Sequence, residues 1–122
     1  MKSALFACSL AFLICISGCA GEEHKKLTVL EDQSITYICE ERQEIDAVYY
    51  SLSDNSLHFV KITLPDGTKY TLPQALSASG VRYTDGFDLV WWTKGMTAFA
   101  ETCDEKGEWQ IKYKECSAIQ TH

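Results

Sequence analysis

The side chains that could carry out chemistry are few and widely separated in this chain. Its three histidines, His24, His58 and His122, have no other histidine or cysteine at the close spacing of a zinc site. The sequence also has no glycine-rich phosphate loop and no nucleophile elbow. Cys103 and His58 could form a thiol–imidazole pair, but a leftover cysteine in a strand is far more often inert. The sequence therefore predicts neither an enzyme nor a metal or cofactor site.

A second group of polar side chains flanks one predicted hairpin. Ser77 and Ser79 belong to a Ser-Ala-Ser-Gly run before the hairpin, and Lys94 follows it, between a tryptophan pair and a glycine. An Asp-Gly turn at residues 84–86 separates a short apolar-aromatic segment from the strongly apolar residues 87–92. This pattern is typical of paired strands, because glycine adopts positive φ without steric cost. We expect the serines and the lysine to occupy two exposed corners.

Alternation of apolar and polar residues predicts strands along the rest of the chain from Ser34 onward. Branched and aromatic residues at alternate positions, bounded by Asn, Asp, Gly and Pro, indicate half-buried strands. In the last strand, Trp109, Ile111 and Tyr113 are expected to share the buried face. About eight such strands should close into a small barrel or a flattened sandwich, because closure removes exposed edges. We predict an all-β fold, a small antiparallel β-barrel.

The expected strands, in chain order, span residues 35–39, 46–52, 57–64, 68–72, 81–83, 87–92, 97–103 and 108–115.

The N-terminus has the pattern of an exported protein. Lys2 precedes an apolar run, residues 4–16, which is too short to anchor the chain stably across a bilayer. Ile16 stands three positions before Cys19, which resembles the processing site of bacterial lipoproteins, where the cysteine becomes the first residue and carries a lipid. A plain signal peptide with a chance cysteine is the alternative. We expect residues 1–18 to be a lipoprotein signal peptide.

The expected domain organisation follows from this N-terminus. Residues 19–33 would form the lipidated cysteine and a polar tether, and residues 34–122 would form the single barrel domain. Ala20, directly after the cysteine, resembles the sorting pattern of outer-membrane lipoproteins in enteric-type bacteria. We therefore expect the protein to be held in the bacterial envelope by a lipid on Cys19, at the outer membrane and facing the periplasm.

The chain is acidic, and this restricts its partners. It has 17 Asp and Glu residues against 11 Lys and Arg residues, a formal net charge of −6 at pH 7. Such a field opposes binding to nucleic acid or anionic lipid and favours a basic protein partner. No nucleic-acid partner is expected.

Export to an oxidising compartment leaves three cysteines for the barrel, and two of them should pair. If the last hairpin turns near Gly107, Cys103 lies opposite Gln110, and Cys116 lies about 20 Å further along at ~3.3 Å per residue. A disulfide spans at most ~7 Å between Cα atoms, so Cys103 and Cys116 do not pair. Cys39 then pairs with one of the two. We favour Cys39–Cys116, which would join the first strand to the last and leave Cys103 free.

The many aromatic residues leave a second function open. Some small barrels hold one apolar ligand in their interior. In a domain of this size, most of the rings are needed for the core. An envelope lipoprotein that binds a small apolar ligand, or acts as a scaffold, is therefore the alternative function.

Several short motifs together resemble the membrane-bound lysozyme inhibitors of c-type lysozyme. The most specific are Ser-Ala-Ser-Gly-x-Arg-Tyr at residues 77–83 and Trp-x-Lys-Gly at residues 92–95. Tyr-x-Cys at 37–39, Val-x-Tyr at 48–50 and Leu-Pro-x-Gly-x-x-Tyr-x-Leu at 64–72 accompany them. The resemblance implies an eight-stranded barrel whose one disulfide joins the first-strand and C-terminal cysteines, as favoured above.

The same resemblance implies how the protein would act. Members of that family insert a serine-bearing loop into the active-site cleft of c-type lysozyme, while a lysine reaches acidic groups there. Carried over to this chain, Ser79 is the first candidate for the inserting serine, Ser77 is the second, and Lys94 is the lysine. The other residues expected to bind lysozyme or support the loop are Gly80, Arg82 and Tyr83.

Overall fold

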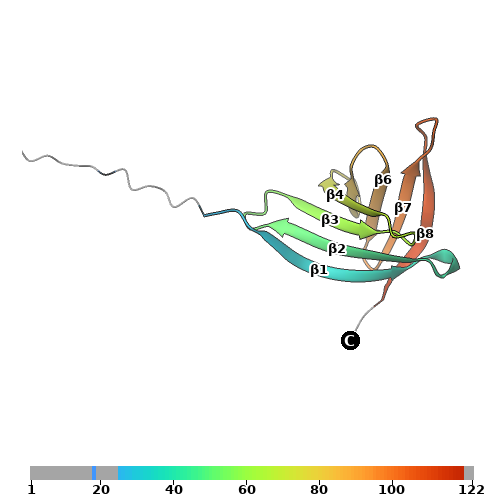
Figure 1. Ribbon diagram of the computed structural model, residues 1–122, viewed down its shortest axis with the longest axis horizontal. Helices are drawn as coiled ribbons and strands as arrows, with labels where there is room; N and C mark the ends of the chain where they lie inside the picture. The colour runs from blue at the N-terminus through green and yellow to red at the C-terminus, as the bar shows by residue number, and fades with distance from the viewer. Residues whose placement is uncertain (1–17, 19–24, 120–122) are drawn as a thin grey trace, which may run out of the picture.

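Eight antiparallel strands form a closed barrel in the structure, a computed structural model that describes Gly18 and residues 25–119. Each strand pairs with the next along the chain, and β8 returns to β1 (Figure 1). The all-β barrel and its single disulfide, predicted from sequence, are thereby confirmed. Residues 1–17 of the expected signal peptide, Cys19, His24 and His122 lie outside the described residues. No helix in the described part of the chain is long and apolar enough to cross a membrane.

The strands are β1 (Val29–Ile38), β2 (Glu44–Leu52), β3 (His58–Thr63), β4 (Lys69–Ala75), β5 (Val81–Thr84), β6 (Leu89–Lys94), β7 (Thr97–Cys103) and β8 (Trp109–Ile119), with a 3-10 turn, η1 (Glu40–Arg42), between β1 and β2.

The first strand begins earlier than the sequence predicts. β1 starts at Val29, within the expected tether of residues 19–33, and its first residues pair with the end of β2. Thr28 and Ser53 extend this pairing: the backbone N–H of Ser53 donates to the Thr28 carbonyl (2.9 Å), and the Thr28 N–H donates to Ser53 Oγ (3.1 Å). The chain therefore enters the barrel beside the β2–β3 connection.

Phe87 was predicted in a strand but lies in the β5–β6 turn, where it is 78% exposed. The cause is Asp85, whose Oδ1 accepts hydrogen bonds from the backbone N–H groups of Phe87 and Asp88 (both 2.9 Å) and of Leu89 (3.3 Å). Donors held by the turn are not available to a strand ladder. Partial burial opposes ionisation of Asp85, but these three N–H groups hold its pKa below the ordinary value.

The barrel closes where β1 meets β8. Three residue pairs join the two strands, and the Cys39–Cys116 disulfide links them just beyond. The predicted pairing is confirmed, and Cys103 is free. Cys103 lies opposite Trp109 rather than Gln110, so the predicted register of the last hairpin was wrong by one residue.

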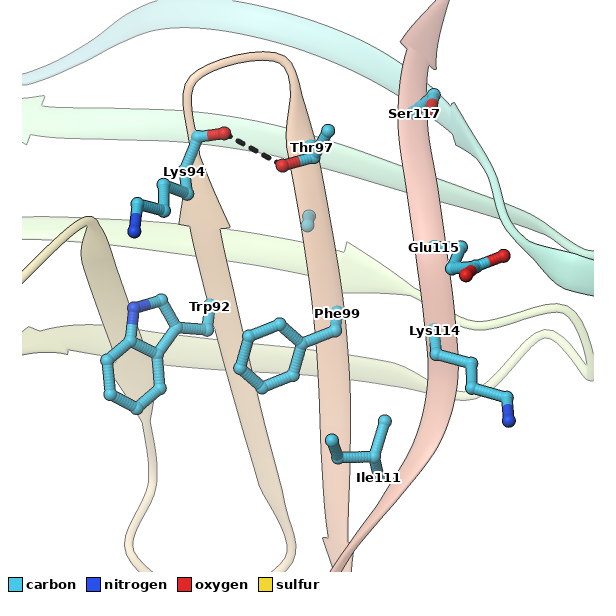
Figure 2. Close-up of a pocket in the computed structure, with 9 residues that line it drawn as sticks. Trp92, Lys94, Thr97, Phe99, Ile111, Lys114, Glu115 and Ser117 are labelled. Atoms are coloured by element: carbon cyan, nitrogen blue, oxygen red, sulfur yellow. Dashed lines mark hydrogen bonds between the residues drawn. The ribbon is translucent and has the colours of Figure 1, made fainter.

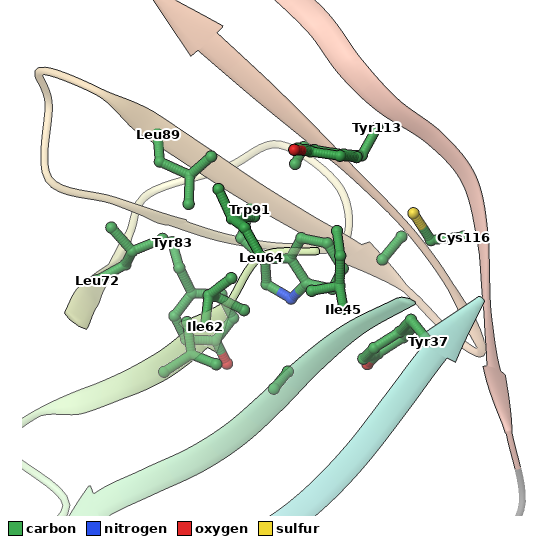
Figure 3. Close-up of a cluster of buried hydrophobic side chains, with 14 of the residues drawn as sticks. Tyr37, Ile45, Ile62, Leu64, Leu72, Tyr83, Leu89, Trp91, Tyr113 and Cys116 are labelled. Atoms are coloured by element: carbon green, nitrogen blue, oxygen red, sulfur yellow. The ribbon is translucent and has the colours of Figure 1, made fainter. Parts of the chain in front are cut away.

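Inward-facing side chains fill the barrel (Figure 3). Tyr37 and Trp91 pack edge to face there, with ring centroids 5.0 Å apart. Their polar atoms converge on Tyr49: its hydroxyl lies 2.8 Å from the Tyr37 hydroxyl and accepts a hydrogen bond from Trp91 Nε1 (3.0 Å). Burial raises the pKa of both tyrosines. The core is therefore apolar except for a small satisfied polar network. Fully buried aliphatic side chains around it are Ile45, Val60, Ile62, Leu72 and Leu89.

The last strand departs from the predicted alternation. Tyr113 is buried as expected, but Trp109 and Ile111 are 39% and 55% exposed, so their prediction as core residues was wrong. Tyr113 pairs with Ala100 of β7, and Ile111 pairs with the next β7 residue, Glu101. Lys112 is therefore an extra residue in β8 with no partner in β7. Such a β-bulge reverses which side chains face inward. Trp109 and Ile111 therefore lie on the outside of the barrel.

Candidate functional site

The predicted serines and lysine lie at the same end of the barrel, on neighbouring connections. Residues 76–80, here called the serine loop, join β4 to β5, and residues 94–97, here called the lysine turn, join β6 to β7. Val81 pairs with Thr93 at the end of the β5–β6 ladder. The loop that ends before Val81 and the turn that begins after Thr93 are therefore next to each other.

The two serines of the loop differ in what their hydroxyls do. Ser77 Oγ donates a hydrogen bond to the carbonyl of Gly80 (2.9 Å) and so braces the loop internally. Ser79 is exposed, and within the described residues its hydroxyl has no hydrogen-bond partner. A hydroxyl of this kind can donate to and accept from an external group. Ser79 is thus the loop serine available to a partner.

Side chains on the outer face of β5 and β6 hold the backbone of the loop. Arg82 Nη1 donates to the carbonyl of Leu76 (3.2 Å), and Trp92 Nε1 donates to the carbonyl of Ser79 (2.9 Å). The Arg82 guanidinium carbon lies 6.0 Å from the centroid of the Trp92 ring. On its other side, Trp92 stacks with Phe99 of β7 at 5.7 Å and an interplanar angle of 24°. Both ends of the serine loop are therefore fixed to the sheet.

Gly80 allows the loop to approach β6 closely. Its φ is +66°, a left-handed conformation that residues with a side chain rarely adopt. A Cβ atom at this position would collide with the carbonyl oxygen of Thr93 and lie 3.0 Å from Trp92 Nε1. Gly80 is required by the conformation of the loop.

Lys94 presents a free positive charge beside the serine loop. It is exposed, and Thr97 Oγ1 donates to its backbone carbonyl (2.9 Å), which closes the lysine turn (Figure 2). In the described part of the chain the one salt bridge joins Lys114 Nζ to Glu40 (3.6 Å), so the Lys94 ammonium has no carboxylate partner there. An unpaired ammonium is available to an acidic group of a partner.

Tyr83 lies inside the barrel rather than on the binding surface. It is 8% exposed, its ring centroid lies 5.7 Å from that of Tyr49, and burial raises its pKa. Its position supports β5 from within. The other predicted site residues lie at the surface near one another: Ser77, Ser79, Gly80, Arg82 and Lys94.

The outer face of β6–β8 was not predicted from the sequence. Trp92, Phe99 and Ile111 line a hollow of about 410 Å³ that is bordered by Lys94 (Figure 2). Part of this face had a signal in the sequence, because alternate residues of a strand point to opposite faces, so one of Trp91 and Trp92 had to point outward. Ile111 had no such signal, because the bulge in β8 reverses its direction.

A second hollow, of about 420 Å³, lies on the other side of the serine loop. Its lining includes Leu57, the exposed His58, and Ser77. Cys103 lies at the opposite end of the barrel, where β7 ends, so the structure does not bring it to His58. Within the described residues there is no group of three or more His, Cys, Asp or Glu side chains that could hold a metal ion.

The arrangement is suited to binding a pair of acidic groups. A hydroxyl on a narrow loop can enter a cleft and hydrogen-bond a carboxyl group, while an ammonium beside it pairs with an ionised carboxylate. Removal of water from such contacts strengthens them, because the local dielectric constant falls.

Comparison with known proteins gives three findings. A family model described as membrane-bound lysozyme-inhibitor of c-type lysozyme matches residues 37–113. A membrane-bound lysozyme inhibitor of C-type lysozyme from Yersinia enterocolitica is 46% identical over 55 residues, which cover 45% of this chain and 44% of that protein. The aligned part thus spans less than half the length of that relative. The Adhesin Complex Protein from Neisseria meningitidis superposes with a TM-score of 0.49 and 14% identity, over 75% of this chain and 98% of that one.

Proposed function

The chain belongs to the family of membrane-bound lysozyme inhibitors of c-type lysozyme, and from this premise we propose that it binds a c-type lysozyme and blocks its active-site cleft. The family is one of enzyme inhibitors and not of enzymes. The observation that carries the proposal is the Val81–Thr93 pair, which sets the exposed Ser79 hydroxyl and the unpaired Lys94 ammonium at one edge of the barrel.

The chemistry of the target fits these two groups. C-type lysozyme cleaves glycans with two carboxyl groups, one protonated and acting as a general acid and one that stays ionised. In the proposed complex, the Ser79 hydroxyl hydrogen-bonds one carboxyl group and the Lys94 ammonium pairs with the ionised one. Both contacts gain strength when the inserted loop expels water from the cleft.

The rest of the surface assists the encounter in this proposal. The net charge of −6 attracts a basic lysozyme from a distance, and added salt screens that attraction at separations beyond about one Debye length. The positive charge of Lys94 then acts locally, against the acidic groups of the cleft. In this proposal the net charge of the chain acts over a long distance during the encounter, whereas Lys94 acts only in direct contact with the cleft.

The proposed location is the bacterial envelope. The family description names a membrane-bound protein, and Cys19 follows an apolar run with the spacing of a lipoprotein processing site. We propose that a lipid on Cys19 holds the protein at the outer membrane, facing the periplasm, where it protects the cell wall from lysozyme.

The alternative, a small apolar ligand inside the barrel, has less support. Side chains such as Trp91 and Ile62 are fully buried and pack against one another in the interior. A ligand there would have to displace them, at the cost of well-packed contacts.

The test is turnover of a cell-wall substrate by a c-type lysozyme, with and without residues 20–122 as purified, oxidised protein. Loss of activity at a one-to-one ratio is the expected result. Full lysozyme activity at a large excess of folded protein would overturn the proposal.

A further inference from the structure

Trp92 makes the only hydrogen bond in the described chain that joins a side chain outside the serine loop to the backbone of Ser79. The bond runs from Trp92 Nε1 to the Ser79 carbonyl over 2.9 Å, and both groups are at the surface. Trp92 is not needed for the core, because the inward-facing tryptophan of the pair is Trp91. Its contacts are with the loop and with the outer face of the sheet.

The Trp92 ring is itself held in place. Phe99 stacks on it, with centroids 5.7 Å apart, and the Arg82 guanidinium lies within 6.0 Å of its centroid. Stacking and cation–π contacts of this kind keep an aromatic ring in one orientation. Figure 2 shows Trp92 and Phe99 side by side on the outside of β6 and β7. The donor that reaches Ser79 is therefore fixed by the rigid sheet.

The loop backbone lies directly against this ring. A Cβ atom on Gly80 would come within 3.0 Å of Trp92 Nε1 and 3.3 Å of its Cδ1. The peptide between Ser79 and Gly80 therefore rests on the indole. Since Ser79 has no side-chain partner among the described residues, the position of its hydroxyl depends on how this peptide is held.

We infer that Trp92 is the positioning residue of the inhibitory loop: its indole N–H holds the Ser79 carbonyl and thereby keeps the Ser79 hydroxyl in the conformation that enters the lysozyme cleft. The inference rests on the proposed function and adds to it a residue that acts through Ser79. A loop that is already in the binding conformation loses less entropy on binding. When only a fraction of molecules has that conformation, the apparent affinity falls by the same fraction.

The variant that tests this is Trp92→Phe, which keeps an aromatic ring for stacking on Phe99 but removes the donor. Trp109→Phe is the matched control, because Trp109 is a partly exposed tryptophan of the same outer face and its side chain makes no hydrogen bond within the described residues. The first measurement is NMR relaxation of backbone amides in the free protein. The second is the inhibition constant against a c-type lysozyme, with association and dissociation rates.

We expect Trp92→Phe to increase the motion of residues 77–80 while the amides of β5–β7 and the unfolding midpoint stay close to those of the wild type. The inhibition constant should rise about fivefold, the effect of one lost neutral hydrogen bond, through a lower fraction of binding-competent loop. Trp109→Phe should change neither quantity. Gly80→Ala, which displaces the loop by a different route, should weaken inhibition further.

The outcomes separate this inference from the proposed function. A wild-type protein that fails to inhibit lysozyme overturns the proposed function and, with it, the role of Trp92 in inhibition. An inhibiting wild type whose Trp92→Phe variant has an equally ordered loop and an unchanged inhibition constant overturns the positioning role alone. Equal losses in Trp92→Phe and Trp109→Phe would also overturn it, because the effect would then belong to the whole apolar face.

Discussion

Trp91 and Trp92 are neighbours in the chain, yet their indole N–H groups serve opposite sides of the barrel wall. Trp91 is fully buried and donates to the Tyr49 hydroxyl (3.0 Å), whereas Trp92 lies outside and donates to the Ser79 carbonyl (2.9 Å). One dipeptide therefore ties the core of the barrel to the loop that we propose enters lysozyme. Changes on the two sides should have separable effects on stability and on inhibition.

Inside the wall, Tyr49→Phe should lower stability without affecting inhibition. The substitution leaves the buried Trp91 N–H without its acceptor, which costs about 1–3 kcal/mol of unfolding free energy. Urea denaturation at pH 7 measures it. Tyr50→Phe is the control, because Tyr50 is half-buried, stacks on Phe59 and makes no side-chain hydrogen bond within the described residues. Equal stability of the two variants would contradict the assigned role of the Tyr49 hydroxyl.

In the serine loop, Ser79→Ala should weaken inhibition more than it affects the fold. A hydrogen bond to a charged or partly charged group contributes about 1.5–3 kcal/mol, so the inhibition constant should rise about 10- to 100-fold. The unfolding midpoint should not change, since the Ser79 hydroxyl has no partner among the described residues. Ser77→Ala provides the comparison, because it removes the internal bond to Gly80 (2.9 Å). If Ser77→Ala alone weakened inhibition, the assignment of the two serines would be reversed.

Lys94→Ala should weaken inhibition at least about 30-fold, because truncating one partner of a desolvated charge pair costs ~2 kcal/mol or more. Measurements from low to high salt should give similar ratios of variant to wild type, since a contact buried in a cleft is poorly screened. Lys69→Ala is the matched control, an exposed lysine at the start of β4. A loss for Lys69→Ala as large as that for Lys94→Ala would indicate a general charge effect instead of a specific contact.

Replacing Cys39 and Cys116 together with serine should lower the free energy of unfolding by about 4 kcal/mol. The disulfide closes a loop with a sequence separation of 77, and chain entropy in the unfolded state sets the size of this effect. Cys103→Ser should leave stability nearly unchanged, because Cys103 is free and only partly buried. Denaturant curves of oxidised samples give both values. A large loss for Cys103→Ser would mean that its thiol has a structural role.

At low pH, Asp85 should contribute to loss of stability. Its carboxyl pKa is lowered in the folded protein below its ordinary value, because three backbone N–H groups outweigh the opposing effect of burial. The stabilisation is therefore complete above the unfolded-state pKa and is lost as pH falls through the folded-state pKa. The urea midpoint of Asp85→Asn should therefore decline less steeply between about pH 5 and pH 2 than that of the wild type, because the variant has no carboxyl group to protonate at this position. Parallel pH profiles of variant and wild type would refute this.

The sequence predicted the barrel well because each strand has one buried face and the turns contain residue types that favour turns. Val60 and Ile62 alternate with polar residues, and Pro65, Asp66 and Gly67 mark a turn, so the hairpins were visible without tertiary information. Strand geometry excluded a Cys103–Cys116 disulfide and left Cys39 to pair with one of the two; the favoured pair, Cys39–Cys116, is the one that forms. Ser79 and Lys94 came from the family resemblance, and the ladder of β5 and β6 then explained why they are neighbours.

The rest depended on interactions that alternation does not encode. The Asp85 carboxylate accepts a hydrogen bond from the Phe87 N–H and so places Phe87 in a turn. The extra residue Lys112 makes Ile111 face outward. Neither event changes the composition of the segment, so an apolar residue at the right spacing looked like core in both cases. The contact of Trp92 with Ser79 joins two separate connections of the barrel, and only the folded backbone brings them together.

The chain enters the barrel beside the β2–β3 connection, at the same end as the serine loop, and this has a consequence for an anchored molecule. Thr28 is hydrogen-bonded to Ser53 of the β2–β3 connection, and residues of that connection line the same hollow as Ser77. If Cys19 carries the lipid, the end of the barrel that would receive lysozyme is also the end at which the lipid-bearing segment joins the barrel. The segment from Cys19 to Val29 can extend at most about 35 Å, at ~3.5 Å per residue, close to the ~30 Å diameter of a small domain. The length of this segment would then determine whether a lysozyme fits between the barrel and the membrane.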